Sequence, residues 1–269
     1  MRQKWRNRLP AERRTDALML LEVKNLGIAF GGLRALEDLN MKLELGEIVG
    51  LIGPNGAGKT TVFNLLTGVY PPTEGAIRLN GQSIIGMKTY KINRRGIART
   101  FQNIRLFGDM SVLDNVKVAM SGETDYSAIA GVFRLPSYWR EEKRIDKKAK
   151  EILETLDLLE FAETNAKNLP YGKQRKLEIA RALGSSPKVL LLDEPAAGMN
   201  PTETKELMDA IAKIRQQYNI AILLIEHDMS FVMGICQRLI VLDYGKVIAQ
   251  GLPKDVRRDP KVIAAYLGE

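Results

Sequence analysis

The chain contains the segment Gly53-Pro54-Asn55-Gly56-Ala57-Gly58-Lys59-Thr60, followed by Thr61. The segment fits the pattern of a phosphate-binding loop and lies between an apolar run at residues 48–52 and a helical pattern at residues 61–67. Glycines allow successive backbone N–H groups to turn toward phosphate oxygens, and the start of a helix adds partial positive charge. Lys59 supplies a full charge, and the Thr60 hydroxyl group can ligate magnesium. These features predict a polyphosphate site, and the alternative is a glycine-rich turn that caps an ordinary helix.

The composition is typical of a globular protein with a sizeable core. The 269 residues are 45% hydrophobic and 27% charged, which excludes disorder and fibrous repeats. No apolar run approaches the roughly 18 residues of a membrane-spanning helix, so any membrane role is expected to depend on a partner. The one cysteine, Cys236, cannot form an internal disulfide, which suits a reducing compartment, and we expect it to be a buried small hydrophobe.

The formal net charge of +8 is concentrated at the N-terminus. Residues 1–14 hold six basic side chains and one acidic side chain, a net +5, so residues 15–269 carry +3. Because the body of the chain is close to balanced, we expect no nucleic-acid partner. Residues 1–17 are expected to form a basic flexible tail, and weak attraction to an anionic membrane face is the alternative.

Strand patterns alternate with helix patterns from residue 18 onward, which predicts a largely parallel sheet. Apolar runs at residues 48–52, 189–192, 220–225 and 239–242 predict its central strands. Between about residues 88 and 185 strand patterns disappear, and apolar residues recur at helical spacing. The clearest case is Ala149, Ile152, Leu153, Leu156 and Leu159. This region is therefore predicted to be an inserted helical lobe.

Polar residues follow two of the predicted central strands. Asp193 and Glu194 come directly after the run at residues 189–192, at the sheet edge where doubly wound folds bind ligands. Asp193 is expected to hold magnesium, and Glu194 to take a proton from the attacking water. Alone the pair is weak evidence, because strands that enter a polar turn often end in Asp. His227, the only histidine, is expected at the same edge within reach of a γ-phosphate oxygen, although a lone histidine is more often structural.

Together these segments resemble the nucleotide-binding subunits of ABC transporters from about residue 20 to the end. The resemblance implies an α/β fold, with a P-loop NTPase (RecA-like) core sheet, an antiparallel β subdomain and an inserted α-helical subdomain. Residues 18–269 would then comprise a core at about 18–87 and 186–251, a helical subdomain at about 88–185 and a C-terminal helical segment at 252–269. A GTPase or kinase outside transport, and an ABC protein of DNA repair or translation, are the rival classes.

The resemblance assigns further site residues. Phe30 corresponds to the aromatic residue that stacks on adenine, and the alternative is a strand residue in the core. Gln102 corresponds to the glutamine of the loop that joins the helical subdomain to the core and senses magnesium. The expected catalytic residues are therefore Gln102, Glu194 and His227. The expected magnesium ligands are Thr60, Gln102 and Asp193.

The signature segment departs from the usual Leu-Ser-Gly-Gly-Gln of the family. Here it is Leu169-Pro170-Tyr171-Gly172-Lys173-Gln174. In the family this segment grips the γ-phosphate bound to the opposite subunit, and Pro170 has neither the hydroxyl group nor the N–H group of the usual serine. Asn200 is a second departure, because many relatives have Asp there. Its position before Pro201 and Glu203 also predicts a helix cap.

These departures, with the loop at residues 196–201 and the ending at residues 262–268, resemble the ATP-binding subunits of branched-chain amino-acid importers. The resemblance implies a peripheral ATPase at the cytoplasmic face of the inner membrane, with ATP and Mg²⁺ as cofactors. The implied partners are a second ATP-binding subunit in a head-to-tail pair, two membrane permease subunits and, indirectly, an extracytoplasmic solute-binding protein. We expect the second ATPase to be a different chain and the surface at residues 103–168 to meet the permeases. Lipid or lipopolysaccharide export and urea or amide import are the alternatives, because such subunits never touch the solute.

Overall fold

The computed structural model describes residues 19–123 and 133–267, so the tail predicted for residues 1–17 lies outside the described residues. A six-stranded sheet forms the centre, in the order β10-β9-β3-β8-β7-β6. Its strands are β3 (Ile48–Ile52), β6 (Ile97–Arg99), β7 (Val189–Asp193), β8 (Ala221–Ile225), β9 (Arg238–Asp243) and β10 (Lys246–Gly251). Only β10 pairs antiparallel with its neighbour. Every residue of β3, β7 and β8 is buried, as the uniformly apolar runs predict.

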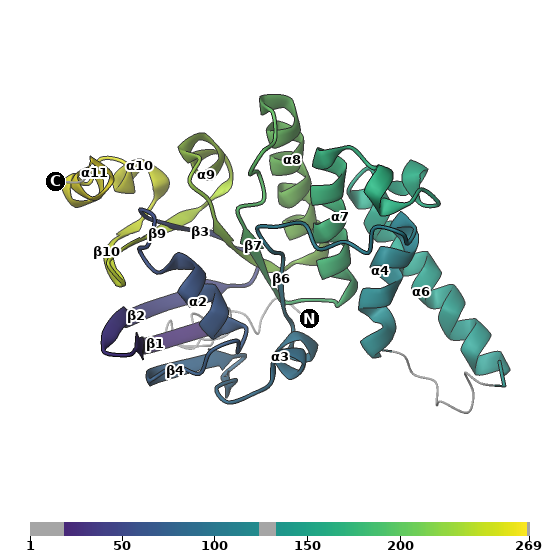
Figure 1. Ribbon diagram of the computed structural model, residues 1–269, viewed down its shortest axis with the longest axis horizontal. Coiled ribbons are helices and arrows are strands. Elements are labelled where there is room, and N and C mark those ends of the chain that lie inside the picture. Colours follow the sequence, from purple (N-terminus) through teal and green to yellow (C-terminus); the bar gives the residue numbers. More distant parts are fainter. Residues whose placement is uncertain (1–18, 124–132, 268–269) are drawn as a thin grey trace, which may run out of the picture.

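A second, antiparallel sheet lies to one side of the first (Figure 1). It has the order β2-β1-β4-β5, formed by β1 (Met19–Phe30), β2 (Leu33–Glu44), β4 (Glu74–Leu79) and β5 (Gln82–Ser83). Helix α2 (Lys59–Leu66) buries Val62 and Phe63 in a core shared by both sheets. The short helix α3 (Thr89–Arg95) leads from this sheet into β6. The second sheet and α2 thus pack on one face of the central sheet, and the phosphate-binding loop leads from the end of β3 into α2.

Helices at the opposite end of the molecule form the inserted lobe (Figure 1). They are α4 (Val112–Met120), α6 (Pro136–Thr155) and α7 (Tyr171–Gly184), with short 3₁₀ helices η1 (Ser121–Glu123), η2 (Leu159–Phe161) and η3 (Ala166–Asn168). Helix α6 buries Ala149, Ile152 and Leu153 as the periodic pattern predicts, but it ends at Thr155, so the expected continuation to Leu159 is wrong. The expectation that strands are absent between about residues 88 and 185 is also wrong, because β6 lies in this range. Strand β6 pairs in parallel with β7, and three residues ending in an arginine are too few to give a strand pattern.

The remaining helices follow the central strands. They are α8 (Pro201–Tyr218), α9 (Met229–Ile235), α10 (Pro253–Val256) and α11 (Pro260–Leu267). Helix α8 begins with the predicted cap: Asn200 Oδ1 accepts from the Glu203 N–H at 3.0 Å, and Glu203 Oε2 accepts from the Asn200 N–H at 3.0 Å. Within the two described ranges, no helix is both long and apolar enough to cross a bilayer.

Replacing Asn200 with alanine is expected to lower the free energy of unfolding by about 1 kcal/mol, because the Glu203 N–H group at the start of α8 loses the side-chain oxygen that accepts its hydrogen bond. Asn200→Asp is the matched control, since aspartate caps a helix equally well. Urea denaturation of both variants measures the difference. Equal stability of the alanine and aspartate variants would contradict the capping role.

Cys236 is 8% exposed, and burial raises the pKa of its thiol to about 12, with the charge of Glu226 adding to the rise. At pH 8 only about one folded molecule in ten thousand then carries the reactive thiolate. We expect iodoacetamide to leave the folded protein unmodified and to alkylate it in urea. Mass spectrometry after timed exposure measures both rates, and equal rates would contradict the burial of the thiol.

Candidate nucleotide-binding site

The phosphate-binding loop joins the end of β3 to the start of α2. Gly53 has φ 149°, and a Cβ atom there would lie 2.0 Å from the Leu242 carbonyl oxygen. Gly58 has φ 103°, and a Cβ atom there would lie 2.9 Å from the Ala35 carbonyl oxygen. The two positions therefore require glycine on both steric and conformational grounds. Helix α2 carries no acidic residue in its first turn, so its N-terminus suits an anion.

Lys59 lies inside this loop. Its Nζ atom donates to the carbonyl oxygens of Gly53 at 2.7 Å and Pro54 at 2.8 Å. Burial lowers the pKa of the Lys59 ammonium group, while the charges of Glu194 and Asp193 raise it. The ammonium group is thus within electrostatic reach of both carboxylates and is held by bonds that phosphate oxygens can replace.

The two carboxylates occupy the end of β7. Asp193 is 6% exposed, and its Oδ2 atom accepts from Arg99 Nη2 at 2.7 Å. Glu194 follows in a left-handed backbone conformation, φ 47°, with its N–H group donating to the Ile225 carbonyl oxygen at 2.9 Å. The turn directs its Oε2 atom to Gln102 Nε2, at 2.8 Å, and His227 Nδ1 lies 4.0 Å from the same oxygen. Gln102, Glu194 and His227, which are far apart in the sequence, therefore meet at one sheet edge.

Arg99 is a site residue that the sequence analysis missed. Its guanidinium group lies over the rings of Phe63 and Phe101, at 5.3 and 5.2 Å from their centroids. Its Nη1 atom donates to Asn64 Oδ1 at 2.7 Å, while its buried Nε atom has no hydrogen-bond partner. The Arg99 and Asp193 side chains are each 7% exposed, so this is a buried ion pair. Arg99 reaches Asp193 only because β6 lies beside β7. Since the sequence does not predict β6, it does not predict this ion pair.

Phe30 is the last residue of β1, and its side chain is exposed to solvent. It is 43% exposed and packs edge-to-face on Tyr70, with ring centroids 5.3 Å apart. The alternative of a core residue is therefore wrong. The ring is available for stacking on a planar ligand.

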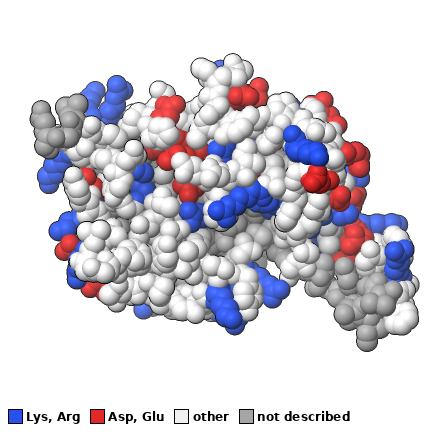
Figure 2. Space-filling view, in the orientation of Figure 1, with Lys and Arg blue, Asp and Glu red and all other residues white. Residues whose placement is uncertain are grey.

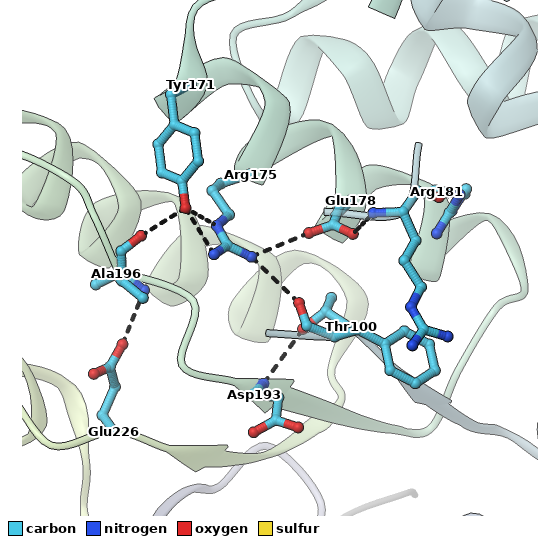
Figure 3. A network of polar contacts seen from close by, with 11 residues as sticks. Thr100, Tyr171, Arg175, Glu178, Arg181, Asp193, Ala196 and Glu226 are labelled. Atoms are coloured by element: carbon cyan, nitrogen blue, oxygen red, sulfur yellow. Dashed lines mark hydrogen bonds and ion pairs between the residues drawn. The ribbon is translucent and has the colours of Figure 1, made fainter. Parts of the chain in front are cut away.

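The signature segment starts helix α7, with Pro170 as the residue before its first turn. The Tyr171 side chain points toward the loop after β7 (Figure 3). Its Oη atom donates to the Ala197 carbonyl oxygen at 2.9 Å. In the described part of the chain, no hydrogen bond or ion pair joins residues 169–174 to residues 53–61. One chain thus brings together the phosphate-binding loop, Gln102, Glu194 and His227, and leaves the signature segment apart from them.

Comparison with known proteins shows to which family the chain belongs. A model of the ABC transporter family matches residues 36–197, and a model described as branched-chain amino acid ATP-binding cassette transporter matches residues 246–269. The chain belongs to the ABC transporter family of ATP-binding subunits. This ABC subunit is 49% identical to the high-affinity branched-chain amino acid transport ATP-binding protein BraF of Pseudomonas aeruginosa, over 93% of this chain and 98% of BraF. It is 50% identical, with the same coverage, to the transport ATP-binding protein LivG of Escherichia coli K12.

Solved structures confirm the predicted fold of this ABC subunit. The ADP conformation of an ATP-binding cassette of an ABC transporter matches it with a TM-score of 0.81 and 31% identity, over 94% of this chain and 100% of that one. The α/β fold predicted from the sequence, with its P-loop NTPase core, is therefore correct. As a member of the family, the ABC subunit binds nucleotide and is an ATPase.

Proposed function

We propose that this chain is the ATP-hydrolysing subunit of an importer of branched-chain amino acids and drives transport through membrane permease subunits. The observation that carries ATP hydrolysis is the contact of the Glu194 carboxylate with Gln102, beside His227 and within electrostatic reach of Lys59. The 49–50% identity to BraF and LivG over nearly their whole length supports the choice of branched-chain amino acids over lipid export or amide import.

Each predicted site residue has a role in this proposal. Residues 53–61 hold the phosphates through backbone N–H groups and Lys59, and the exposed ring of Phe30 stacks on adenine. Glu194 accepts a proton from the attacking water, and Gln102 fixes the Glu194 carboxylate through their 2.8 Å bond. His227, which is 67% exposed in its side chain, is free to reach a γ-phosphate oxygen.

Thr60, Gln102 and Asp193 offer oxygen donors of the kind that Mg²⁺ prefers. The Gln102 amide bonds Glu194 through Nε2, which leaves its Oε1 atom for an ion. Among the described residues no group of three or more His, Cys, Asp and Glu side chains can hold a metal, so nucleotide phosphates and water would complete the coordination. When bound, Mg²⁺ supplies charge that neutralises the phosphates.

The signature segment supports a head-to-tail pair. Residues 169–174 lie apart from the phosphate-binding loop of their own chain and so are available to the nucleotide of a second ATP-binding subunit. Pro170 removes one hydroxyl group and one N–H group from that contact. An asymmetric pair, in which a different chain supplies the complementary signature, accommodates this loss.

A groove beside the Gln102 loop suits the permease subunits. It is lined by residues of β6, α4 and α7 and has a volume of about 430 Å³. Basic side chains, including Arg105 and Arg181, border it, and Lys and Arg gather in the middle of the face that Figure 2 shows. Exposed apolar side chains of Phe107 and Val118 line the same groove. All residues that line the groove belong to the segment at about 88–185, proposed as the helical subdomain. Within that segment β6 is part of the central sheet, so a segment docked in the groove would contact both this sheet and helices α4 and α7.

Purification of the tagged chain from its native membranes with ATP and vanadate, followed by intact mass measurement, tests these partners. We expect a second, different ATPase and two membrane subunits, held at the cytoplasmic face of the inner membrane, with the solute-binding protein joining from the other side. Two copies of this chain on a single kind of membrane protein would contradict the asymmetric pair. Recovery from the soluble fraction alone would contradict the transport function.

A further inference from the structure

Three polar residues on one face of α7 join the signature helix to the nucleotide site (Figure 3). Tyr171, Arg175 and Glu178 follow one another at spacings of four and three residues, so their side chains lie along the same side of the helix. The Tyr171 hydroxyl group donates to the Ala197 carbonyl oxygen and accepts from Arg175 Nε at 3.1 Å and Nη2 at 2.8 Å. We call these three residues the α7 cluster.

The α7 cluster holds the loop that carries Gln102 on both sides of that residue. Arg175 Nη1 donates to the Phe101 carbonyl oxygen at 3.2 Å and lies 3.4 Å from Glu178 Oε2. Glu178 Oε1 accepts from the Arg105 backbone N–H group at 2.8 Å. The path of the backbone from Phe101 to Arg105 is therefore tied to α7.

The same cluster holds the loop that follows Glu194. Tyr171 fixes the Ala197 carbonyl oxygen, and the neighbouring Ala196 N–H group donates to Glu226 Oε1 at 2.8 Å. Glu226 Oε2 accepts from the His227 backbone N–H group at 3.2 Å. These hydrogen bonds therefore restrain backbone atoms within a few residues of Gln102, Glu194 and His227.

Burial confines the action of Arg175 and Glu178 to their own chain, whereas Tyr171 is 42% exposed. The Arg175 and Glu178 side chains are 6% and 3% exposed, so neither can reach a nucleotide bound to another subunit. Burial raises the pKa of the Glu178 carboxyl group, and the bond from the Arg105 N–H group and the charge of Arg175 oppose the rise. Because desolvation offsets the attraction in a buried ion pair, such a pair contributes defined geometry more than stability.

We propose that Tyr171, Arg175 and Glu178 are positioning residues, which fix the Gln102 loop and the loop after Glu194 relative to the signature helix of the same chain. When α7 moves with the helical subdomain, it then displaces the two loops that surround Glu194. The rate of hydrolysis in this chain therefore depends on the position of its own helical subdomain relative to the core. The inference deepens the proposed function and rests on it for the two-subunit arrangement. It differs from the role implied for Tyr171 by family resemblance, which concerns the nucleotide of the opposite subunit.

Tyr171→Phe tests the α7 cluster, because it removes the hydroxyl group and keeps the ring. The variant is placed in two forms of the complete complex that hydrolyse at one site only. In the first form the partner ATPase lacks its catalytic glutamate, so only the site with Glu194 is active. In the second form this chain carries Glu194→Gln, so only the partner's site is active, opposite the signature segment of this chain. Tyr218→Phe is the matched control, since it removes a hydroxyl group that lies 3.3 Å from Thr155 Oγ1, away from the site.

In the first form, Tyr171→Phe is expected to lower the single-turnover rate constant by roughly 10-fold or more at saturating ATP, with the ATP concentration for half-maximal rate unchanged. The second form is expected to lose less activity, and Tyr218→Phe none in either form. Arg175→Lys, which keeps the charge but not the planar fork, is expected to repeat the loss in the first form.

A loss of activity in the second form alone, or rates equal to those of Tyr218→Phe in both forms, would overturn the proposal. A fall in melting temperature that accounts for the lost rate would also overturn it, because it would show a merely structural role. The proposed transport function fails on a different result, namely an unmutated complex that hydrolyses ATP without importing a branched-chain amino acid. In that case the difference in hydrolysis rate between the two forms still tests the α7 cluster.

Discussion

Glu194→Gln is expected to reduce ATP hydrolysis by about 10²- to 10⁴-fold while ATP binding is retained. Glutamine has the shape of glutamate but cannot accept a proton from the attacking water. The Gln102 Nε2 group, which bonds Glu194 Oε2 at 2.8 Å, can still donate to the amide oxygen of the new side chain, so the local geometry is kept. Phosphate release by the complete complex and titration with a fluorescent ATP analogue measure the two properties.

Glu44→Gln is the matched control for this variant. Glu44 is an exposed residue at the end of β2, outside the surface expected to meet the permeases, so the same chemical change there is expected to leave hydrolysis unaltered. Undiminished turnover in Glu194→Gln would remove Glu194 from the catalytic role. Loss of ATP binding in the same variant would show that the carboxylate holds the nucleotide or the loop instead.

Lys59→Ala is expected to weaken ATP binding by at least about 100-fold, which corresponds to ~3 kcal/mol. In the structure the Lys59 ammonium group bonds two carbonyl oxygens of its own loop, from which it can turn to phosphate oxygens. Hydrogen bonds to charged groups contribute about 1.5–3 kcal/mol each, so the loss of one or two of them gives an effect of this size. Calorimetric titration with ATP and Mg²⁺ measures the affinity.

Lys213→Ala, at an exposed position of α8, controls for the loss of a positive charge. We expect its affinity for ATP to match that of the unmutated chain. A normal titration of Lys59→Ala would contradict the assignment of residues 53–61 as the phosphate-binding loop. Adenosine, which lacks phosphates, is expected to bind the two variants equally.

The parts of the fold that could be predicted are those that depend on neighbouring residues. Strands β3, β7 and β8 are buried on both faces, so their sequences are uniformly apolar and recognisable. The cap of α8 involves only Asn200, Pro201 and Glu203. Strand β6 could not be predicted because three residues give no pattern, and its place is set by pairing with β7 across the chain.

The same distinction applies to the nucleotide site. Parallel strands end at the same sheet edge, so the groups that follow β7 and β8 could be placed together from the sequence. The Arg99–Asp193 ion pair spans 94 residues, and the bond from Tyr171 to Ala197 spans 26. No local pattern encodes such contacts, and they appear only once β6, β7 and α7 are packed against one another.

Uptake of radiolabelled leucine by the purified complex in proteoliposomes tests the central claim most directly. With ATP on the side of the ATPase and the solute-binding protein on the other, the account predicts accumulation that stops when this chain carries Glu194→Gln. ATP hydrolysis without uptake of leucine, isoleucine or valine would contradict it.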